Sequence, residues 1–178
     1  LSTTHIAWGA VRLEPVWMQT GEAAGVAAAL AKRKQTTPGK LSGDELARAL
    51  ADERHLVSFF NDFEVSASDE WVPAVQYLGT KGFFADYDAR PTAPLTREVA
   101  QLWAEGLATL RSGKHDGNAL ARRVAKASID DGKAQDETIT ASDFARLLRL
   151  PPSESLDEAE PITRGAAAQK IYQLLTTR

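Results

Sequence analysis

Apolar residues recur along most of the chain at the three- and four-residue spacing of amphipathic helices. This spacing predicts helices over 16–34, 43–53, 69–81, 97–110, 118–129, 141–150 and 164–176. Residues 1–10 carry Ser, Thr, Gly and aromatic side chains without helical periodicity, and we expect them to be irregular or extended. The predicted fold class is therefore all-α, with a long Ala-rich helix near the start and at most one or two short strands.

Small polar residues mark where most of these helices begin. A Ser or Thr at the position before a helix accepts a hydrogen bond from a free backbone N–H of the first turn. On this basis we predict N-caps at Ser42, Ser68, Thr96, Thr140 and Thr163. Three of the caps share a local pattern, an apolar residue followed by Thr, at 94–97, 138–141 and 161–164. This pattern indicates an internal repeat.

The helix predicted at 16–34 contains two glycines in its interior. Glycine destabilises a helix interior by about 1 kcal/mol relative to alanine. Gly21 and Gly25 are four residues apart and therefore share one face of the helix, with Ala24 and Ala28 nearby. This pattern predicts a face that another backbone or a cofactor approaches closely.

Composition argues against several classes of function. With 21 basic and 24 acidic residues and a net charge of −3, the chain gives no support for nucleic-acid binding. The longest apolar stretch, 23–31, is much too short to span a membrane. The chain has no cysteine, and His5, His55 and His115 lie far apart in sequence, so we expect no metal site. No pair of carboxylates is placed for acid–base work, which leaves the catalytic residues unknown.

Residues 2–31 carry a series of glycines and functional side chains in a specific order. The positions that define the series are His5, Gly9, Arg12, Pro15, Met18, Gly21 and Gly25. The last two belong to a Gly-x-Ala-Ala-Gly-x-Ala-Ala-Ala string. In this order the segment resembles the closing segment of a family of bacterial FAD-dependent oxidoreductases.

The resemblance implies a cofactor site at the start of the helix at 16–34. In the family, this helix directs its N-terminus, which carries partial positive charge, at the flavin ring of FAD. The residues that the resemblance places there are Arg12, Pro15, Val16, Trp17 and Met18, with backbone N–H groups of 16–18 as donors. For His5, a structural role and a role near the flavin both stay open.

The chain lacks the part of such an enzyme that holds the AMP half of FAD. No Gly-x-Gly-x-x-Gly fingerprint follows a predicted strand anywhere in it. We therefore expect the chain to be the C-terminal part of an FAD-dependent oxidoreductase whose N-terminal FAD-binding domain is missing here. We also expect it to be inactive and to hold no FAD when alone.

The region at about 57–178 resembles S-layer homology repeats, most closely over 60–110. The matching positions are Phe60, Asp62, Trp71, Gly82, Tyr87, Thr96 and Arg97. Two departures are that Glu98 follows Arg97 directly, where the pattern has Ala, and that Ala85-Asp86 replaces a Gly before Tyr87. Thr163-Arg164 would open the second helix of a degenerate later repeat, whereas Thr140-Ala141 lacks the Arg.

By this resemblance the repeats work in threes and bind acidic cell-wall polymers through Arg and Trp side chains. Arg97 and Arg164 are then the candidates for contacts with the polymer, since Arg is an unusual residue for the first turn of a helix. The alternative is that the repeats survive only as a packing scaffold, with Trp71 and Trp103 buried.

These interpretations divide the chain into three segments. They are the incomplete closing segment of an FAD-binding domain at 1–35, a connecting helix at 36–56, and an S-layer-homology-like helical domain at 57–178. The expected function is that of an oxidoreductase fragment. The alternative is a module that binds envelope polysaccharide or another subunit. A bacterial and extracytoplasmic setting would fit both, and the sequence does not identify the substrate.

Overall fold

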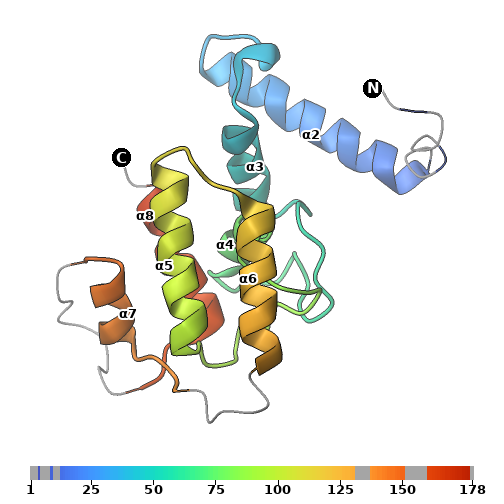
Figure 1. Ribbon diagram of the computed structural model, residues 1–178. Helices are drawn as coiled ribbons and strands as arrows, with labels where there is room; N and C mark the ends of the chain where they lie inside the picture. Colours follow the sequence, from blue (N-terminus) through green and yellow to red (C-terminus); the bar gives the residue numbers. More distant parts are fainter. Residues whose placement is uncertain (1–3, 5–8, 10–12, 131–136, 151–159, 177–178) are drawn as a thin grey trace. The chain divides into compact units, whose positions relative to one another are not determined.

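The computed structural model describes residues 4, 9, 13–130, 137–150 and 160–176, and these residues are organised by helices (Figure 1). The elements are α2 (Glu14–Arg33), η1 (Pro38–Lys40), α3 (Gly43–Asp52), α4 (Val72–Gly79), α5 (Arg97–Arg111), α6 (Gly117–Asp130), α7 (Ala141–Leu147) and α8 (Arg164–Thr176). Only isolated β-bridges, and no strand, occur in this part of the chain. The predicted all-α class is confirmed, whereas the expectation for residues 1–10 falls almost wholly outside the described residues.

The chain divides into two compact units, Leu1–Leu56 and Val57–Arg178. In the first unit, α2 packs against α3. Its buried side chains include Leu30 and Ala31 on α2 and Leu50 on α3. Lys34, just after α2, forms an ion pair with Glu45 of α3. None of the described helices is both long and apolar enough to cross a bilayer.

Four of the five predicted caps hold their helices as expected. The side chains of Ser42, Thr96, Thr140 and Thr163 each accept a hydrogen bond from the backbone N–H three residues later. Each bond satisfies one of the donors that a helix start leaves without an intrahelical partner.

The fifth cap, Ser68, was wrong. Helix α4 begins at Val72, and Trp71 is its N-cap residue without a side-chain cap bond. Pro73 accounts for the later start, because proline lacks an N–H and fits only the first turn of a helix. Helix α7 also ends earlier than predicted, at Leu147, because Arg149 adopts a left-handed conformation with a φ of 58°.

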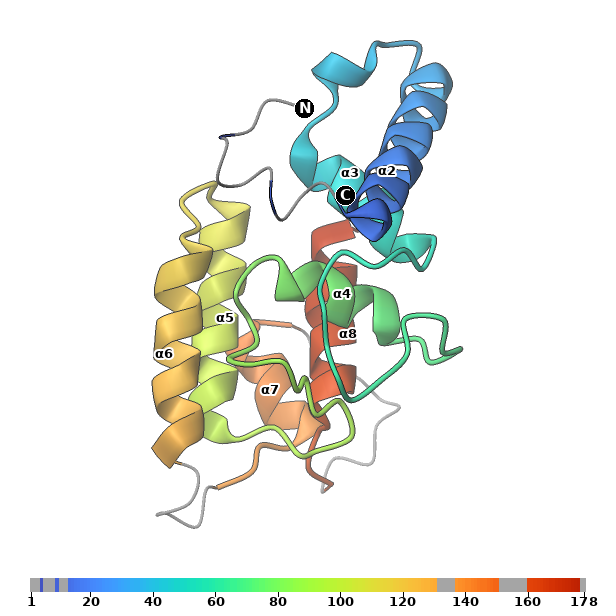
Figure 2. The same ribbon diagram turned by 90° about the vertical axis from the view of Figure 1, so that its right-hand side faces the viewer.

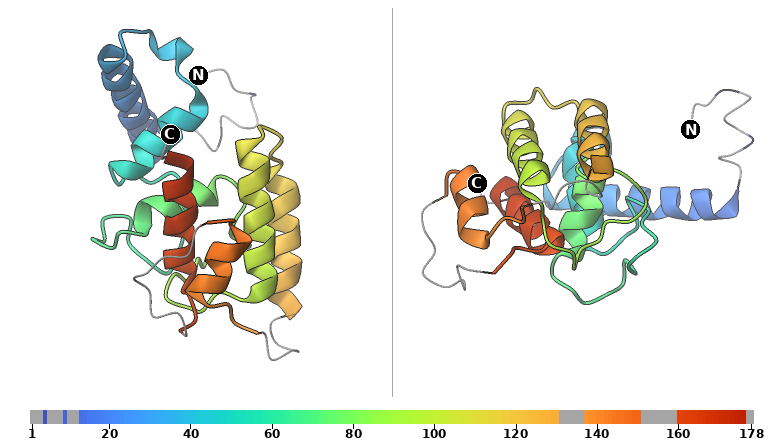
Figure 3. Two further views of the ribbon diagram at one scale, coloured as in Figure 1. Left: turned by 90° about the vertical axis from the view of Figure 1, so that its left-hand side faces the viewer. Right: turned by 60° about the horizontal axis from the view of Figure 1, so that its bottom comes forward.

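The second unit is built from helices that pack in neighbouring pairs. Helix α4 lies beside α8, α5 lies beside α6, and α7 contacts α5 (Figures 2 and 3). The core between them is aromatic, with Trp103, Tyr77, Phe83 and Phe144 almost completely buried. The indole N–H of Trp103 donates to the carbonyl oxygen of Phe83 at 2.8 Å, so this buried polar group is satisfied.

The three Thr-capped helix openings meet in this unit. The N–H of Leu95 donates to the carbonyl of Ile162 at 2.8 Å. The N–H of Ile139 donates to Leu95 at 3.0 Å, and that of Ile162 donates to Ile139 at 2.9 Å. The three hydrogen bonds form a closed ring, in which the residue just before the Thr of each opening donates one bond and accepts another. The internal repeat seen in sequence therefore corresponds to a threefold arrangement of α5, α7 and α8.

Candidate functional site

The opening turn of α2 is the first candidate site. Pro15 lies in this turn, and Leu13 is the N-cap residue without a side-chain cap bond. The backbone N–H groups of Val16 and Trp17 donate to the Leu13 carbonyl at 3.1 and 3.4 Å. The turn is thus a regular helix start made rigid by proline, as the sequence predicts.

These bonds limit how the turn could hold a ligand. Two of the predicted backbone donors, Val16 and Trp17, are already bonded within the turn. The described part of the chain gives the N–H of Glu14 no acceptor. A ligand at this turn would therefore meet the Glu14 amide and the partial charge of the helix end. Arg12 and His5 lie outside the described residues.

One face of α2 is apolar and yet exposed. Leu13 is 58% exposed, Trp17 38% and Met18 69%. Further along the helix, Gly21 and Gly25 are exposed, and a Cβ added to either would meet no atom within 4 Å. A solvent-facing helix face normally carries polar residues. This face, defined here as the small-residue face (Trp17, Met18, Gly21, Ala24, Gly25 and Ala28), has the composition of a buried surface.

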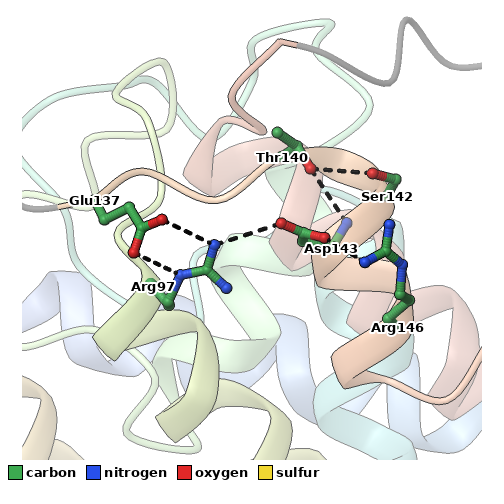
Figure 4. Close-up of polar contacts among 6 residues, drawn as sticks. All are labelled: Arg97, Glu137, Thr140, Ser142, Asp143 and Arg146. Atoms are coloured by element: carbon green, nitrogen blue, oxygen red, sulfur yellow. Dashed lines mark hydrogen bonds and ion pairs between the residues drawn. The ribbon is translucent and has the colours of Figure 1, made fainter.

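The second candidate site is the pair of predicted polymer-binding arginines. Arg97, in the first turn of α5, forms ion pairs with Glu137 at 3.1 Å and Asp143 at 3.4 Å (Figure 4). The hydrogen bond and charge of Glu137, joined by those of Asp143, raise the pKa of Arg97 above its ordinary value. Asp143 also pairs with Arg146 at 2.9 Å. The Arg97 guanidinium is thus accessible, with two carboxylates competing for it.

Arg164 has different surroundings, although it occupies the equivalent position in the ring of openings. Its side chain is buried, and Nε donates to the Ala89 carbonyl at 2.9 Å. Its guanidinium lies over the rings of Phe84 and Trp103, 5.6 and 5.4 Å from their centroids. A polymer could reach this group only if the packing opened. Contact between Arg164 and a polymer stays a prediction.

Other residues of the repeat pattern also contribute to packing. The carboxylate of Asp62 accepts the N–H groups of Ala89 and Arg90 at 3.1 and 2.6 Å, which holds the loop before α5. The Trp71 ring lies so close to Gly165 that a Cβ there would come within 2.9 Å of it. Trp103 is fully buried, whereas Trp71 is half-buried.

Sequence reasoning missed the carboxylate partners of Arg97. Glu137 lies 40 residues further along the chain, and only the ring of openings brings it to α5. The signal that was available is the acidic Asp143 in the first turn of α7, which follows the same Thr pattern. Among the residues that the structure describes, no group of three His, Asp or Glu side chains is placed to hold a metal ion.

Comparison with known proteins bears on the first unit. Residues 1–50 match the family of FAD dependent oxidoreductases. The match confirms the resemblance predicted for residues 2–31 and includes the opening turn of α2. It does not extend to residues 57–178, so the S-layer homology resemblance and the bacterial origin stay predictions. No curated protein and no solved structure matches the chain significantly.

Proposed function

We propose that residues 1–50 form the closing segment of an FAD-binding domain, and that the opening turn of α2 lies against the flavin. The observation that carries the proposal is the family match over residues 1–50, which spans α2 and most of α3. The small-residue face of α2 supports it, since that face is exposed in this chain although its composition suits a buried contact.

The residues fit one edge of a flavin site and not a whole one. Pro15 keeps the first turn rigid, and the amide of Glu14 and the helix dipole would favour negative charge on a bound group. Trp17 and Met18 would add apolar contact beside it. FAD supplies hydride and electron transfer when bound. The dinucleotide-binding part, which would hold the AMP half, would come from the partner domain.

A chimera tests this proposal. Residues 1–50 replace the corresponding closing segment of a known FAD-dependent oxidoreductase, and bound flavin is measured by its visible absorbance. We expect the chimera to hold FAD, and the host enzyme without any closing segment to be colourless. Replacing both Gly21 and Gly25 by Leu should remove the FAD, because the added side chains would hold the two surfaces apart.

The matched control is Gln19→Leu, an exposed position of α2 outside the small-residue face. This variant of the chimera should keep its FAD. A folded, monodisperse chimera that holds no more FAD than the host without a closing segment would overturn the proposal.

A second proposed function concerns residues 57–178, as a module that binds acidic envelope polysaccharide. The observation that favours it is the threefold ring of Thr-capped openings, because the repeats it resembles work in threes. Arg97 is the contact residue that a polymer carboxylate could reach, by replacing Glu137 as its partner. Arg97→Ala should weaken sedimentation with a bacterial cell-wall fraction, whereas Arg146→Ala should not. Absence of any binding by the native chain would leave the ring as a packing scaffold.

A further inference from the structure

A groove follows the C-terminal half of α5 and reaches the end of α7. Its volume is about 640 Å³. Apolar side chains line its floor, chiefly Ala104, Leu107 and Ala108 of α5 and Leu147 of α7. Arg111 and Arg149 stand on its rim. The groove lies within the second unit and at the opposite end of α5 from Arg97.

The groove is open because α7 is short. Helices α5, α7 and α8 start from equivalent Thr-capped openings, but they contain 15, 7 and 13 residues respectively. Helix α7 stops at the edge of the groove, where Leu147 and Arg149 line it. A stretch of α5 thus remains exposed at Ala108 although its neighbours Leu107 and Leu148 are buried.

The rim of the groove carries net positive charge. Arg111 is held in place by a hydrogen bond from its guanidinium to the Leu174 carbonyl at 3.0 Å. The Arg149 side chain is exposed and makes no hydrogen bond or ion pair in the described part of the chain, although its backbone N–H donates to the Arg146 carbonyl at 2.9 Å. Glu105, the acidic residue of the lining, is paired with Arg123 at 2.7 Å. An anion would therefore find two arginines and no unpaired carboxylate of the lining.

The backbone does not explain why residue 149 is an arginine. Arg149 has a φ of 58°, a conformation that side chains disfavour and that glycine adopts readily. At the equivalent position after α5, two residues beyond the helix end, the chain has Gly113 with a φ of 70°. Gln35 after α2 and Arg54 after α3 occupy the same place with φ values of 52° and 64°, so what distinguishes Arg149 is its position beside the groove and not its backbone conformation.

We infer that this groove binds a single-chain amphiphilic anion. Its carboxylate or phosphate would lie between Arg111 and Arg149, and its apolar chain would follow Ala104, Ala108 and Leu147. Arginine suits this head group because its planar N–H donors match carboxylate and phosphate oxygens. An apolar floor next to a charged rim selects against hydrophilic polyanions, which would leave the floor in water.

Calorimetric titration of the full chain with straight-chain carboxylates, from acetate to decanoate and below their micellar concentrations, tests the inference. Affinity should rise about fourfold for each methylene that the groove buries. An alkyl phosphate of equal length should bind with similar affinity. The uncharged alcohol should bind at least about tenfold more weakly. Equal affinity for acetate and decanoate would show that the groove does not bind the apolar chain. Equal affinity for decanoate and decanol would show that the arginines do not bind the head group. Either result would overturn the inference.

Arg149→Gly separates binding from folding. Glycine relieves the backbone strain, so this variant should be folded and at least as stable, and yet bind decanoate about tenfold more weakly. Arg146→Ala, an exposed arginine of α7 outside the groove lining, is the control and should bind like the native chain. Unchanged decanoate affinity in Arg149→Gly would overturn the inference. So would binding to vesicles of anionic phospholipid without binding to the monomeric amphiphiles, since it would indicate a membrane surface instead.

Discussion

At the scale of single residues, the second unit shows that equivalent positions in a repeat need not do equivalent work. Arg97 and Arg164 each follow the Thr of a helix opening. Arg97 reaches outward to two carboxylates, whereas Arg164 lies over two aromatic rings with its Nε bonded to a buried carbonyl. A guanidinium can do this because it stacks on aromatic faces and is less strongly hydrated than an ammonium group.

The contrast predicts unequal effects on stability. Arg164→Ala removes a desolvated cation–π contact and a charged hydrogen bond, and should lower the free energy of unfolding by about 2–4 kcal/mol. Arg97→Ala removes exposed ion pairs and should change stability little. Urea unfolding of the two variants of the full chain measures both. Similar decreases in the free energy of unfolding of the two variants would show that the buried contacts of Arg164 do not stabilise the fold more than the exposed ion pairs of Arg97.

At the scale of elements, α2 combines a well-formed helix with a face that the described residues of its own unit leave uncovered. Two of its buried residues, Val26 and Leu30, lie on the opposite side of the helix from Gly21 and Gly25. The two glycines weaken the helix, and no atom in the described part of the chain lies close enough to either of them to require a glycine there. Such a conflict between local preference and observed structure is expected where a sequence serves a partner.

This conflict gives a prediction with opposite signs in two settings. In the chain alone, replacing both Gly21 and Gly25 by Ala should stabilise α2 by at most about 1 kcal/mol per site, because the added methyl groups meet only solvent. In the FAD-loaded chimera, the same variant should lose FAD more readily. Circular dichroism melting and flavin release on dilution measure the two effects. A gain in both settings would mean that nothing packs closely on this face.

Most helices were predictable from sequence because periodicity and caps are local properties. Thr96, Thr140 and Thr163 marked true helix starts, and the shared pattern at these sites indicated the repeat. What could not be predicted depends on distant contacts. The ring through Leu95 and Ile162 joins residues far apart in sequence. The early end of α7 depends on Arg149, which adopts the left-handed conformation that glycine usually adopts after a helix. An arginine in the sequence does not indicate this conformation.

The candidate sites divide in the same way. The order of glycines and functional residues in 2–31 sufficed to identify the family resemblance that the comparison with residues 1–50 supports. The burial of Arg164 could not be predicted, because Arg164 and Arg97 occupy the same position in the sequence pattern. The groove beside α5 could not be predicted from the sequence either, since it arises from the unequal lengths of α5 and α7.

At the scale of the whole molecule, the proposed functions of the two compact units rest on different observations. The family match lies in the first, and the closed ring of openings lies in the second. The second unit has an extensive core of its own, in which Trp103, Phe144 and Ile171 are completely buried. A unit with such a core is expected to unfold cooperatively.

We therefore predict that residues 57–178 fold when expressed alone. The fragment should keep the near-ultraviolet circular dichroism of its buried aromatic residues and unfold in urea in one sharp transition. Comparison with the full chain provides the reference. A fragment without a near-ultraviolet signal, or with a broad and featureless transition, would show that the second unit depends on residues 1–56.

Met18 gives the sharpest test of the proposal that an FAD-binding domain covers the opening turn of α2. It is the only methionine of the chain and is 69% exposed, so its oxidation by peroxide can be followed by mass spectrometry without ambiguity. The measurement compares the free chain with the FAD-loaded chimera, whose Met18 is identified from its own peptide. We expect fast oxidation in the free chain and strong protection in the chimera. Equal rates in the two would contradict it.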